Sequence, residues 1–341
     1  MTKTVLITGV GGSIGCHVLR HVLKNTDWNV VGLDSFRHRG LTDRVYAVTK
    51  KHPETHSRFK IYTHDLRAPI GDLLAKKMGL IDYVINLAAI SDVDVSIADP
   101  TACIMDNTAV AANMFDWARD RYGIRAFLHV STDEVYGPTD GFSEHAEWSP
   151  IVPSNPYSAS KACQEAVAIA YWRTYGVRLI LVNIMNNFGE MQSPAKFPAM
   201  VQRMVRAGET VKIHKFGPAD YGSRFYLHSR NAADAMIFLL DKVVPYKHVQ
   251  WTVDRPDRFN IVGSQQVSNL EMAQLIAEFV GKPLKWEPVD CTTNRPGHDK
   301  AYGLDGKKLR DMGWTPPHSF EWSLRQTVEW YNRNPQWLDL R

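Results

Sequence analysis

Short apolar runs alternate with longer amphipathic stretches along the first half of the chain. Six of these runs have the length and composition of β-strands, and they cover residues 4–10, 28–34, 59–66, 83–89, 126–132 and 178–184. Apolar residues at helical spacing lie between them at 13–25, near 100–121 and near 157–175. Strands separated by helices at this rhythm form a parallel sheet with helices on both faces. The pattern therefore predicts an α/β protein with a doubly wound parallel sheet.

Beyond about residue 186 this rhythm loosens, because prolines and glycines interrupt the pattern. The later elements that we expect are a helix over 231–240, a strand over 258–263, helices near 268–280 and 320–333, and a loop over 294–305. The sequence thus predicts two domains. The sheet domain takes residues 1–186, with 229–262 returning to it, and a smaller mixed α/β region takes 187–228 and 263–341.

Composition narrows the class of protein. The chain is 44% hydrophobic and 22% charged, and it has no apolar run near the roughly 20 residues of a membrane span. The N-terminus has the pattern of a strand rather than of a signal peptide. We therefore expect a cytoplasmic protein that does not associate with a membrane. A net charge of +4 without a basic run argues against nucleic acid, although it suits a phosphorylated metabolite. We expect no metal site and no disulfide framework, because the four cysteines lie far apart: Cys16, Cys103, Cys163 and Cys291.

A glycine-rich turn follows the first predicted strand. In "ITGVGGSIG", Gly9, Gly12 and Gly15 have the spacing GxxGxxG and open the first helix. Such a turn brings backbone N–H groups and a helix N-terminus close to a pyrophosphate. The same triplet also occurs in tight strand-to-helix turns without a ligand. In its present position it predicts a Rossmann dinucleotide site.

Two acidic residues refine this site. Asp34 ends the second strand about 20 residues after the loop, where a carboxylate accepts hydrogen bonds from ribose hydroxyls and repels a 2′-phosphate, which favours NAD over NADP. Arg37 and Arg39 favour the opposite choice, since guanidinium groups bind such a phosphate. Asp65, after the third strand, either meets the adenine edge or starts a helix.

Candidate chemistry gathers in "STDEVYG" and "NPYSASK". Tyr157 and Lys161 are four residues apart, so a helix places them on one face, where an ammonium group lowers the pKa of a phenol. Taken alone, such a pair is usually an exposed helix face. It gains weight because the fifth strand ends at Thr132 and is followed by two neighbouring carboxylates, Asp133 and Glu134. Both carboxylates can serve one site only if the strand stops there.

With these motifs the chain resembles the extended short-chain dehydrogenases/reductases of the NAD-dependent epimerase/dehydratase family. It is most similar to the nucleotide-sugar 4,6-dehydratases, of which the dTDP-glucose 4,6-dehydratases are typical. The resemblance covers almost the whole chain, from "VLITGVGGSIG" through "INLAAISDVDVSI", "STDEVYG", "NPYSASK" and "NNFG" to "RPGHDKAYGLDGKKLRDMGW" and "TVEWYNRNPQWL".

The resemblance implies a reaction and a role for each candidate residue. Tyr157 would take the proton of the sugar 4-hydroxyl while NAD⁺ accepts the C4 hydride, with Thr132 hydrogen-bonded to the same oxygen and Lys161 on the nicotinamide ribose. Glu134 would then remove the C5 proton and Asp133 would protonate the departing C6 hydroxyl. Return of a hydride to C6 and of a proton to C5 would leave an NDP-4-keto-6-deoxyhexose, as in deoxysugar biosynthesis.

The resemblance also implies the ligand contacts. Besides Tyr157 and Lys161, the NAD contacts would be Gly9, Gly12, Ser13, Ile14, Gly15, Asp34, Asp65, Leu66, Ala88 and Asn107. The nucleotide-sugar contacts would be Asn187, Lys196, His214, Arg224, Arg295 and His298. The two arginines are the stronger candidates, because a guanidinium binds phosphate oxygens in bidentate fashion, whereas Lys196 also reads as an ordinary surface lysine.

Several positions depart from the dTDP-glucose pattern. Ile90 and Asp92 stand where those enzymes usually have an acidic residue and a histidine, Glu190 replaces a proline, and His214 lies near the position of an aromatic residue that stacks on the base. These changes surround the base and the hexose rather than the redox groups. They leave open which nucleotide sugar is bound.

Other functions remain open at this point. They are a nucleotide-sugar 4-epimerase, a 5,6-dehydratase, a uronic-acid decarboxylase and a non-catalytic dinucleotide sensor. We also expect a homodimer, since the helices near 100–121 and 157–175 are apolar on more than one face. The candidates for its interface are Ala159, Cys163, Val167 and Ala170.

Overall fold

A parallel sheet of seven strands forms the centre of the molecule. The structure is a computed structural model that describes residues 2–38, 40–218, 220–245, 254–290 and 301–339. The strands are β1 (Thr4–Thr8), β2 (Asn29–Asp34), β3 (Phe59–Thr63), β4 (Tyr83–Asn86), β5 (Ala126–Thr132), β6 (Leu179–Ile184) and β11 (Asp257–Ile261). Their order is β11-β6-β5-β4-β1-β2-β3, and every neighbouring pair is parallel. The predicted fold class is therefore confirmed.

The strand order reverses direction between β1 and β4, since β1 leads outward to β2 and β3 while β4 leads the other way to β5 and β6. Ligands of open α/β sheets bind at such a reversal, outside the carboxyl ends of the strands. Three predicted strands end earlier than their apolar runs, at Thr8, Thr63 and Asn86. The residues that follow them leave the sheet and form loops at this carboxyl edge.

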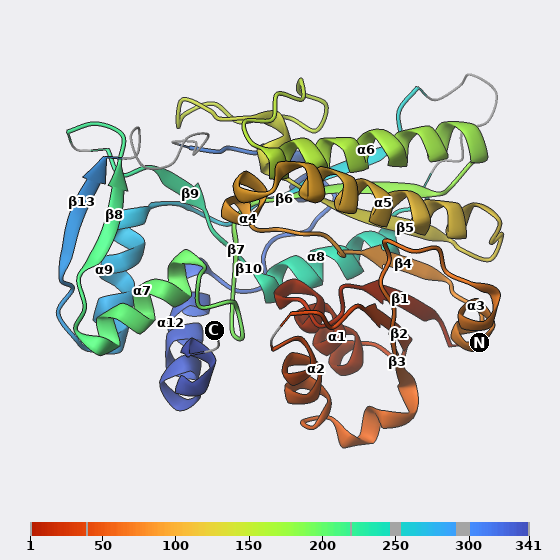
Figure 1. The fold of residues 1–341 in the computed structure, drawn as a ribbon, viewed down its shortest axis with the longest axis horizontal. Helices are drawn as coiled ribbons and strands as arrows, with labels where there is room; N and C mark the ends of the chain where they lie inside the picture. The colour runs from red at the N-terminus through yellow and green to blue at the C-terminus, as the bar shows by residue number, and fades with distance from the viewer. Residues whose placement is uncertain (1, 39, 219, 246–253, 291–300, 340–341) are drawn as a thin grey trace.

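Helices cover both faces of the sheet (Figure 1). α1 (Ser13–Asn25), α2 (Leu41–Thr49) and α8 (Ser229–Lys242) pack on one face, while α3 (Asp72–Met78), α5 (Pro100–Arg119) and α6 (Pro156–Tyr175) pack on the other. Side chains alternate along a strand, so Val5 and Ile7 join the core under α1 and α8, whereas Leu6 joins the core under α5 and α6. The central strands are thus buried on both faces, which explains why their sequences are continuously apolar.

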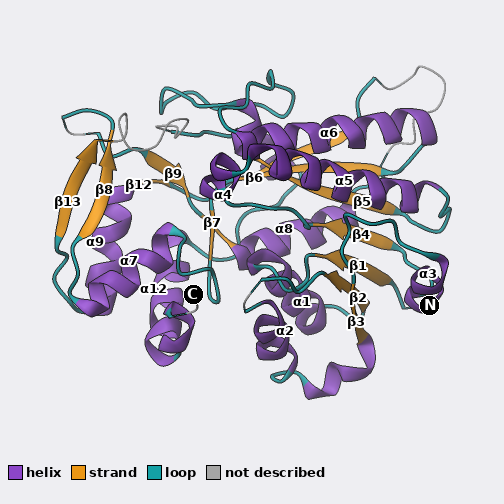
Figure 2. Ribbon diagram, in the orientation of Figure 1, coloured by secondary structure: helices purple, strands orange, loops and turns teal. Residues whose placement is uncertain are grey.

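A second, smaller core lies beside the carboxyl edge of the sheet. It is built from α7 (Phe197–Ala207), α9 (Asn269–Val280) and α12 (Phe320–Arg333) together with the parallel pair β8 (Val211–Lys215) and β13 (Trp286–Asp290). β7 (Asn187–Phe188) and β10 (Leu227–His228) pair with each other between this core and the large sheet (Figure 2). The remaining elements are α4 (Val93–Ala98), β9 (Ser223–Phe225), β12 (Gln266–Ser268), α11 (Lys307–Asp311) and the 3₁₀ turns Pro53–Arg58, Asp133–Tyr136 and Pro335–Leu338.

The later helices agree with the sequence pattern, although α8 starts two residues before the predicted 231 because His228 caps its N-terminus. The short helices α2, α3, α4 and α7 were not expected, because a few turns give too little periodicity. Most of the expected loop over 294–305 lies outside the described residues. Since α8 packs on α1 and β11 extends the sheet, we propose the domain division given above. Within the described part of the chain, no helix is both long and apolar enough to cross a membrane.

Candidate active site

The glycine loop after β1 adopts the backbone that a dinucleotide requires. Gly9 has φ 65°, and a Cβ on Gly15 would lie 2.1 Å from the carbonyl oxygen of Gly9, so neither position accepts a side chain. α1 starts at Ser13, directly after Gly12. The first amides of a helix have no partner within it, and here they lie at the reversal point of the sheet. This cradle fits the pyrophosphate of NAD.

Asp34, at the end of β2, also shapes this loop. Its Oδ2 accepts a hydrogen bond from the Gly11 amide at 2.9 Å, and its Oδ1 accepts one from the Phe36 amide at 3.0 Å. The carboxylate therefore stands beside the glycine loop, where the sequence places a ribose contact. Arg37 lies 3.6 Å from Asp65, so its charge is directed at that carboxylate. Arg39 lies outside the described residues.

The other predicted NAD contacts lie around the same edge. Hydrogen bonds with Arg67 lower the pKa of Asp65 to about 2, so this carboxyl is ionised at neutral pH. Leu66 is buried, and the Ala88 amide donates to the Thr8 hydroxyl at 3.2 Å. Ile14 packs against the core beneath α1, and Asn107 is fully buried on α5.

The carboxylate pair follows β5 as the sequence requires. β5 ends at Thr132, and Asp133 and Glu134 begin a 3₁₀ turn. The Thr132 hydroxyl donates to Asp133 Oδ1 at 2.9 Å and accepts from the Glu134 amide at 3.4 Å. Because the strand has stopped, the two side chains no longer alternate between opposite faces. Both carboxylates lie close enough to Tyr157 to raise the pKa of its phenol.

Asp133 stays partly protonated at neutral pH. Burial, followed by the charge of Glu134, raises its pKa to about 7, against the opposing effects of Thr132 and Arg224. Its side chain is buried, and its Oδ2 has no hydrogen-bond partner among the described residues. A buried carboxyl with a raised pKa and one unpartnered oxygen has the properties of a general acid.

Tyr157 stands in the first turn of α6. Its amide donates to the hydroxyl of Ser96 on α4 at 3.1 Å, which fixes the start of the helix against the loop that follows β4. Burial and the charges of Glu134 and Asp133 raise the pKa of the phenol, while a hydrogen bond with Thr132 lowers it. The sequence suggests a lowering by Lys161, but besides burial the groups that shift this pKa are Glu134, Asp133 and Thr132, and the shift is upward. Tyr157 is a neutral phenol here.

Lys161 is buried one helical turn later. Its Nζ donates to the Val130 carbonyl at 2.7 Å and to Gln164 Oε1 at 2.6 Å. Burial lowers its pKa to about 8, and the charge of Glu165 opposes this shift. Gln164 in turn donates to the Asn107 carbonyl at 2.6 Å, so α5 takes part in fixing the ammonium group. Gln164 was not among the residues singled out from the sequence.

Asn155 is a second residue that sequence reasoning missed. It is the N-cap of α6, where its side chain accepts from the Ser158 amide at 2.9 Å and forms a capping box with Ser158. Its Nδ2 also donates to Glu134 Oε2 at 3.2 Å. An asparagine followed by proline signals a helix start. The contact with Glu134 joins residues 21 positions apart and leaves no such signal.

The predicted substrate residues do not all lie together. Arg224 is buried on β9, lies over the Tyr302 ring at 4.8 Å and interacts electrostatically with Asp133, which brings it to the carboxylate pair. Asn187 lies on β7, and Lys196 Nζ is 3.2 Å from Asp92 Oδ2. His214 lies on β8 in the second core. Arg295 and His298 lie outside the described residues.

Comparisons with known proteins agree with this geometry. A model described as the NAD dependent epimerase/dehydratase family matches residues 5–261. The chain is 32% identical to the dTDP-glucose 4,6-dehydratase of Salmonella typhimurium over 98% of this chain and 94% of that protein. It is 33% identical to the low-salt glycan biosynthesis protein Agl12 of Haloferax volcanii, over 96% of this chain and 98% of that protein.

Solved structures are similar over the same length. A dTDP-glucose 4,6-dehydratase from Streptomyces venezuelae, crystallised with NAD, matches with a TM-score of 0.84 at 30% identity and covers 98% of each chain. A UDP-glucose 4-epimerase from Thermus thermophilus in complex with NAD matches with a TM-score of 0.82 at 25% identity, covering 96% of this chain and 99% of that one.

Proposed function

The chain belongs to the NAD-dependent epimerase/dehydratase family, and from this premise we propose that it is a nucleotide-sugar 4,6-dehydratase. NAD is its cofactor, as in the relatives crystallised with NAD. The glycine loop, with the amides at the start of α1 and the Asp34 carboxylate beside it, fits this group. Bound NAD supplies a hydride acceptor for C4 of the sugar and, once reduced, a hydride donor for C6.

We assign Tyr157 as the base that accepts the proton of the sugar 4-hydroxyl. In the chain alone its phenol is neutral, since burial and two carboxylates raise its pKa. The positive charge of oxidised NAD acts in the opposite direction and favours the phenolate. Tyr157 thus accepts a proton only when the oxidant is present, and Thr132 orients the same oxygen. The ammonium group of Lys161 is held by the Val130 carbonyl and by Gln164.

The carboxylate pair carries the elimination. Oxidation at C4 acidifies the C5 proton, which Glu134 removes, and Asp133 protonates the C6 hydroxyl, which leaves as water. A proton returns to C5 when C6 takes up the hydride. The proposal rests above all on the difference between these neighbours. Asp133 is buried with a pKa of about 7, whereas Glu134 is partly exposed and accepts a hydrogen bond from Asn155. An acid and a base side by side are what elimination needs, whereas epimerisation at C4 requires neither.

The experiment that tests the proposal is incubation of the purified protein with dTDP-, UDP-, GDP- and CDP-hexoses, followed by mass spectrometry of the product. A dehydratase product is lighter than its substrate by one water. A product of unchanged mass with altered configuration at C4 would identify an epimerase instead. The four nucleotides are needed because the departures at Asp92, Glu190 and His214 leave the base and the hexose open.

Two finer features also belong to this proposal. We infer a homodimer that pairs α5 and α6 with the same helices of a second copy. Cys163 and Ala170 are exposed on α6, and Met105 on α5 has 65% of its surface exposed. An exposed apolar face on two adjacent helices supports such a contact. The cytoplasmic location stays the prediction made from the N-terminal sequence.

A further inference from the structure

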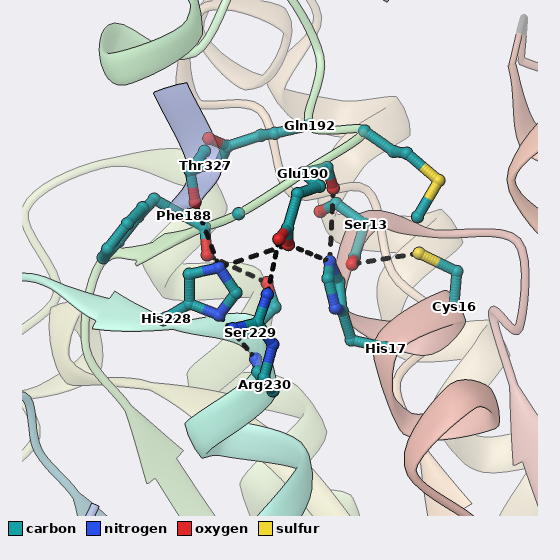
Figure 3. Close-up of polar contacts among 12 residues, drawn as sticks. Ser13, Cys16, His17, Phe188, Glu190, Gln192, His228, Ser229, Arg230 and Thr327 are labelled. Carbon is teal, nitrogen blue, oxygen red and sulfur yellow. Dashed lines mark hydrogen bonds and ion pairs between the residues drawn. The ribbon is translucent and has the colours of Figure 1, made fainter. Parts of the chain in front are cut away.

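A buried carboxylate outside the catalytic residues lies in the loop that follows β7. Glu190 has 6% of its side chain exposed. Arg230 Nη2 lies 2.5 Å from its Oε1, and His228 Nε2 lies 3.3 Å and His17 Nε2 3.6 Å from its Oε2 (Figure 3). These partners come from α1, from the end of β10 and from the start of α8. Glu190 therefore joins α1 to the junction of β10 and α8, two segments that are far apart in the sequence.

The protonation states in this cluster leave one ion pair. Burial acts to raise the pKa of Glu190, but its contacts with His228, His17 and Arg230 hold it well below the usual range. Burial lowers the pKa of His17 to about 4 and also lowers the pKa of His228, so both rings are neutral at pH 7. The Arg230 amide donates to His228 Nδ1 at 2.9 Å, which leaves the ring proton on Nε2, 3.2 Å from Thr327 Oγ1 and 3.3 Å from Glu190 Oε2. Arg230 is thus the cationic partner of Glu190, and the two histidines lie against this carboxylate as neutral rings.

A buried ion pair of this kind adds little to stability, because the desolvation of both charges offsets their attraction. The ion pair with Arg230 instead fixes the position of Glu190 in its loop. Ser229, between the two residues that hold Glu190, donates to Asn187 Oδ1 and to the Phe188 carbonyl. Three consecutive residues, His228, Ser229 and Arg230, therefore hold both ends of the Asn187–Glu190 segment.

The middle of this segment is closely packed and has little room for a side chain. A Cβ on Gly189 would lie 3.3 Å from His17 Nε2, 3.3 Å from His228 Nε2 and 3.3 Å from Ser229 Oγ. The residue after Glu190, Met191, has the left-handed φ of 63°, and its carbonyl accepts from Arg44 Nε at 2.6 Å. Arg44 also donates to the carbonyl of Gly11 in the glycine loop at 3.2 Å.

The contacts of this segment fix the side-chain amide of Asn187. Its Oδ1 is engaged by Ser229, and its Nδ2 is buried without a hydrogen-bond partner among the described residues. The orientation of the amide is therefore set, with a donor left for a ligand. A buried donor without a partner is costly, which makes it a point where a ligand oxygen would bind.

We propose that Glu190 is a positioning residue for the nucleotide sugar: it anchors the Asn187–Gln192 loop so that Asn187 Nδ2 faces a diphosphate or hydroxyl oxygen of the substrate. This assignment rests on the proposed function for the class of substrate. Arg44 donates hydrogen bonds to Met191 in this loop and to Gly11 in the glycine loop, so it connects the two loops.

The test compares Glu190→Gln with the wild-type holoenzyme. The amide keeps the size of the side chain and removes its charge, so the loop loses the ion pair with Arg230. We expect the Kd of dTDP or UDP, measured by calorimetry, and the KM of the matching sugar nucleotide to rise about tenfold, the loss of roughly one good hydrogen bond. kcat should stay within about twofold, because the groups at the reacting carbons are untouched. Glu209→Gln makes the same chemical change in an exposed ion pair with Arg203 and serves as the matched control.

Two further variants separate positioning from general stability. Ser229→Ala removes the bond to Asn187 and leaves the ion pair, so it should weaken binding by a similar factor, even if Glu190→Gln fails to fold. In an Asn187→Ala background, Glu190→Gln should weaken binding no further. Unchanged Kd and KM in both single variants, or fully additive losses in that background, would overturn the positioning role. A wild-type protein that binds none of the dTDP, UDP, GDP and CDP probes would instead overturn the proposed function, and this inference with it.

Discussion

Asn155 Nδ2 donates a hydrogen bond to Glu134 Oε2 at 3.2 Å, while the same side chain caps the helix that carries Tyr157. One residue thus links the proposed base for C5 to the proposed base for the 4-hydroxyl. Substitutions of Asn155 can separate its capping of α6 from its contact with Glu134. Serine is also a good N-cap, but it is too short to reach Glu134.

We expect Asn155→Ser to keep the free energy of unfolding within about 0.5 kcal/mol of wild type, and Asn155→Ala to lower it by about 1 kcal/mol. Both variants should slow elimination, since Glu134 loses its donor. Chemical denaturation and single-turnover kinetics measure the two effects. Wild-type elimination in Asn155→Ser would show that the contact with Glu134 has no part in the reaction.

Tyr157→Phe should abolish turnover and leave the fold and the bound NAD intact. Only the phenol oxygen is lost, and no contact of the glycine loop or Asp34 depends on it. The measurements are the rate of product formation and the NAD content of an extract of the denatured protein. Near wild-type turnover would remove Tyr157 from the mechanism, and an extract that contains only NADP would contradict the role of Asp34.

Substitutions of Glu134 and of Asp133 should block different steps of the reaction. Glu134→Gln should still permit oxidation at C4, so that reduced NAD accumulates while solvent deuterium does not enter C5. Asp133→Asn should slow the loss of the C6 hydroxyl and leave exchange at C5 detectable. Each change should cost about 10²- to 10⁴-fold in turnover. If both variants turn over normally, the pair is a solvated strand end and the 4-epimerase becomes the better assignment.

Asp133 should also make stability depend on pH. Its folded-state pKa of about 7 lies above the ordinary 3.8, so between these values the folded protein holds a proton that the unfolded chain has released. The contribution of this group to the free energy of unfolding is therefore largest below pH 3.8 and is lost as the pH rises toward 7. A pKa difference of about three, at about 1.4 kcal/mol for each unit, gives a loss of up to about 4 kcal/mol.

Asparagine has no charge to desolvate, so Asp133→Asn should be more stable than wild type at about pH 8, and this difference should shrink at about pH 5. Urea unfolding of both proteins at the two pH values measures it, and groups common to both cancel in the comparison. A difference that is the same at both pH values would contradict the raised pKa.

The exposed face of α5 and α6 predicts a dimer. We expect light scattering to give twice the mass of the chain at micromolar concentration. Ala170→Glu should shift the mass toward the monomer, because Ala170 is exposed on α6 and a charge there has to be desolvated in the contact. Ala207→Glu makes the same change at an exposed position on α7, outside the proposed contact, and should leave the mass unchanged. Only monomer in the wild-type protein would count against the dimer.

Much of the fold and of the catalytic set followed from local patterns. Six parallel strands were expected from apolar runs, and the turn after β1 from Gly9, Gly12 and Gly15, because strand burial and glycine backbone freedom are properties of neighbouring residues. Tyr157 and Lys161 could be placed on one helix face by counting residues. The end of β5 at Thr132 was required by the two carboxylates that follow.

Other features depend on tertiary packing. Glu190 lies 173 residues from His17 in the sequence, and Arg44 lies 147 residues from Met191, yet each pair meets across two packed elements. The neutral state of Tyr157 and the raised pKa of Asp133 depend on burial and on every charge nearby. Periodicity fixes which face of an element a residue occupies, but it carries no information on which distant element covers that face. Local patterns therefore predicted the fold class, which is confirmed, and the candidate redox residues. How the carboxylates and the substrate loop are held was set by packing, because these contacts join segments that local spacing does not relate.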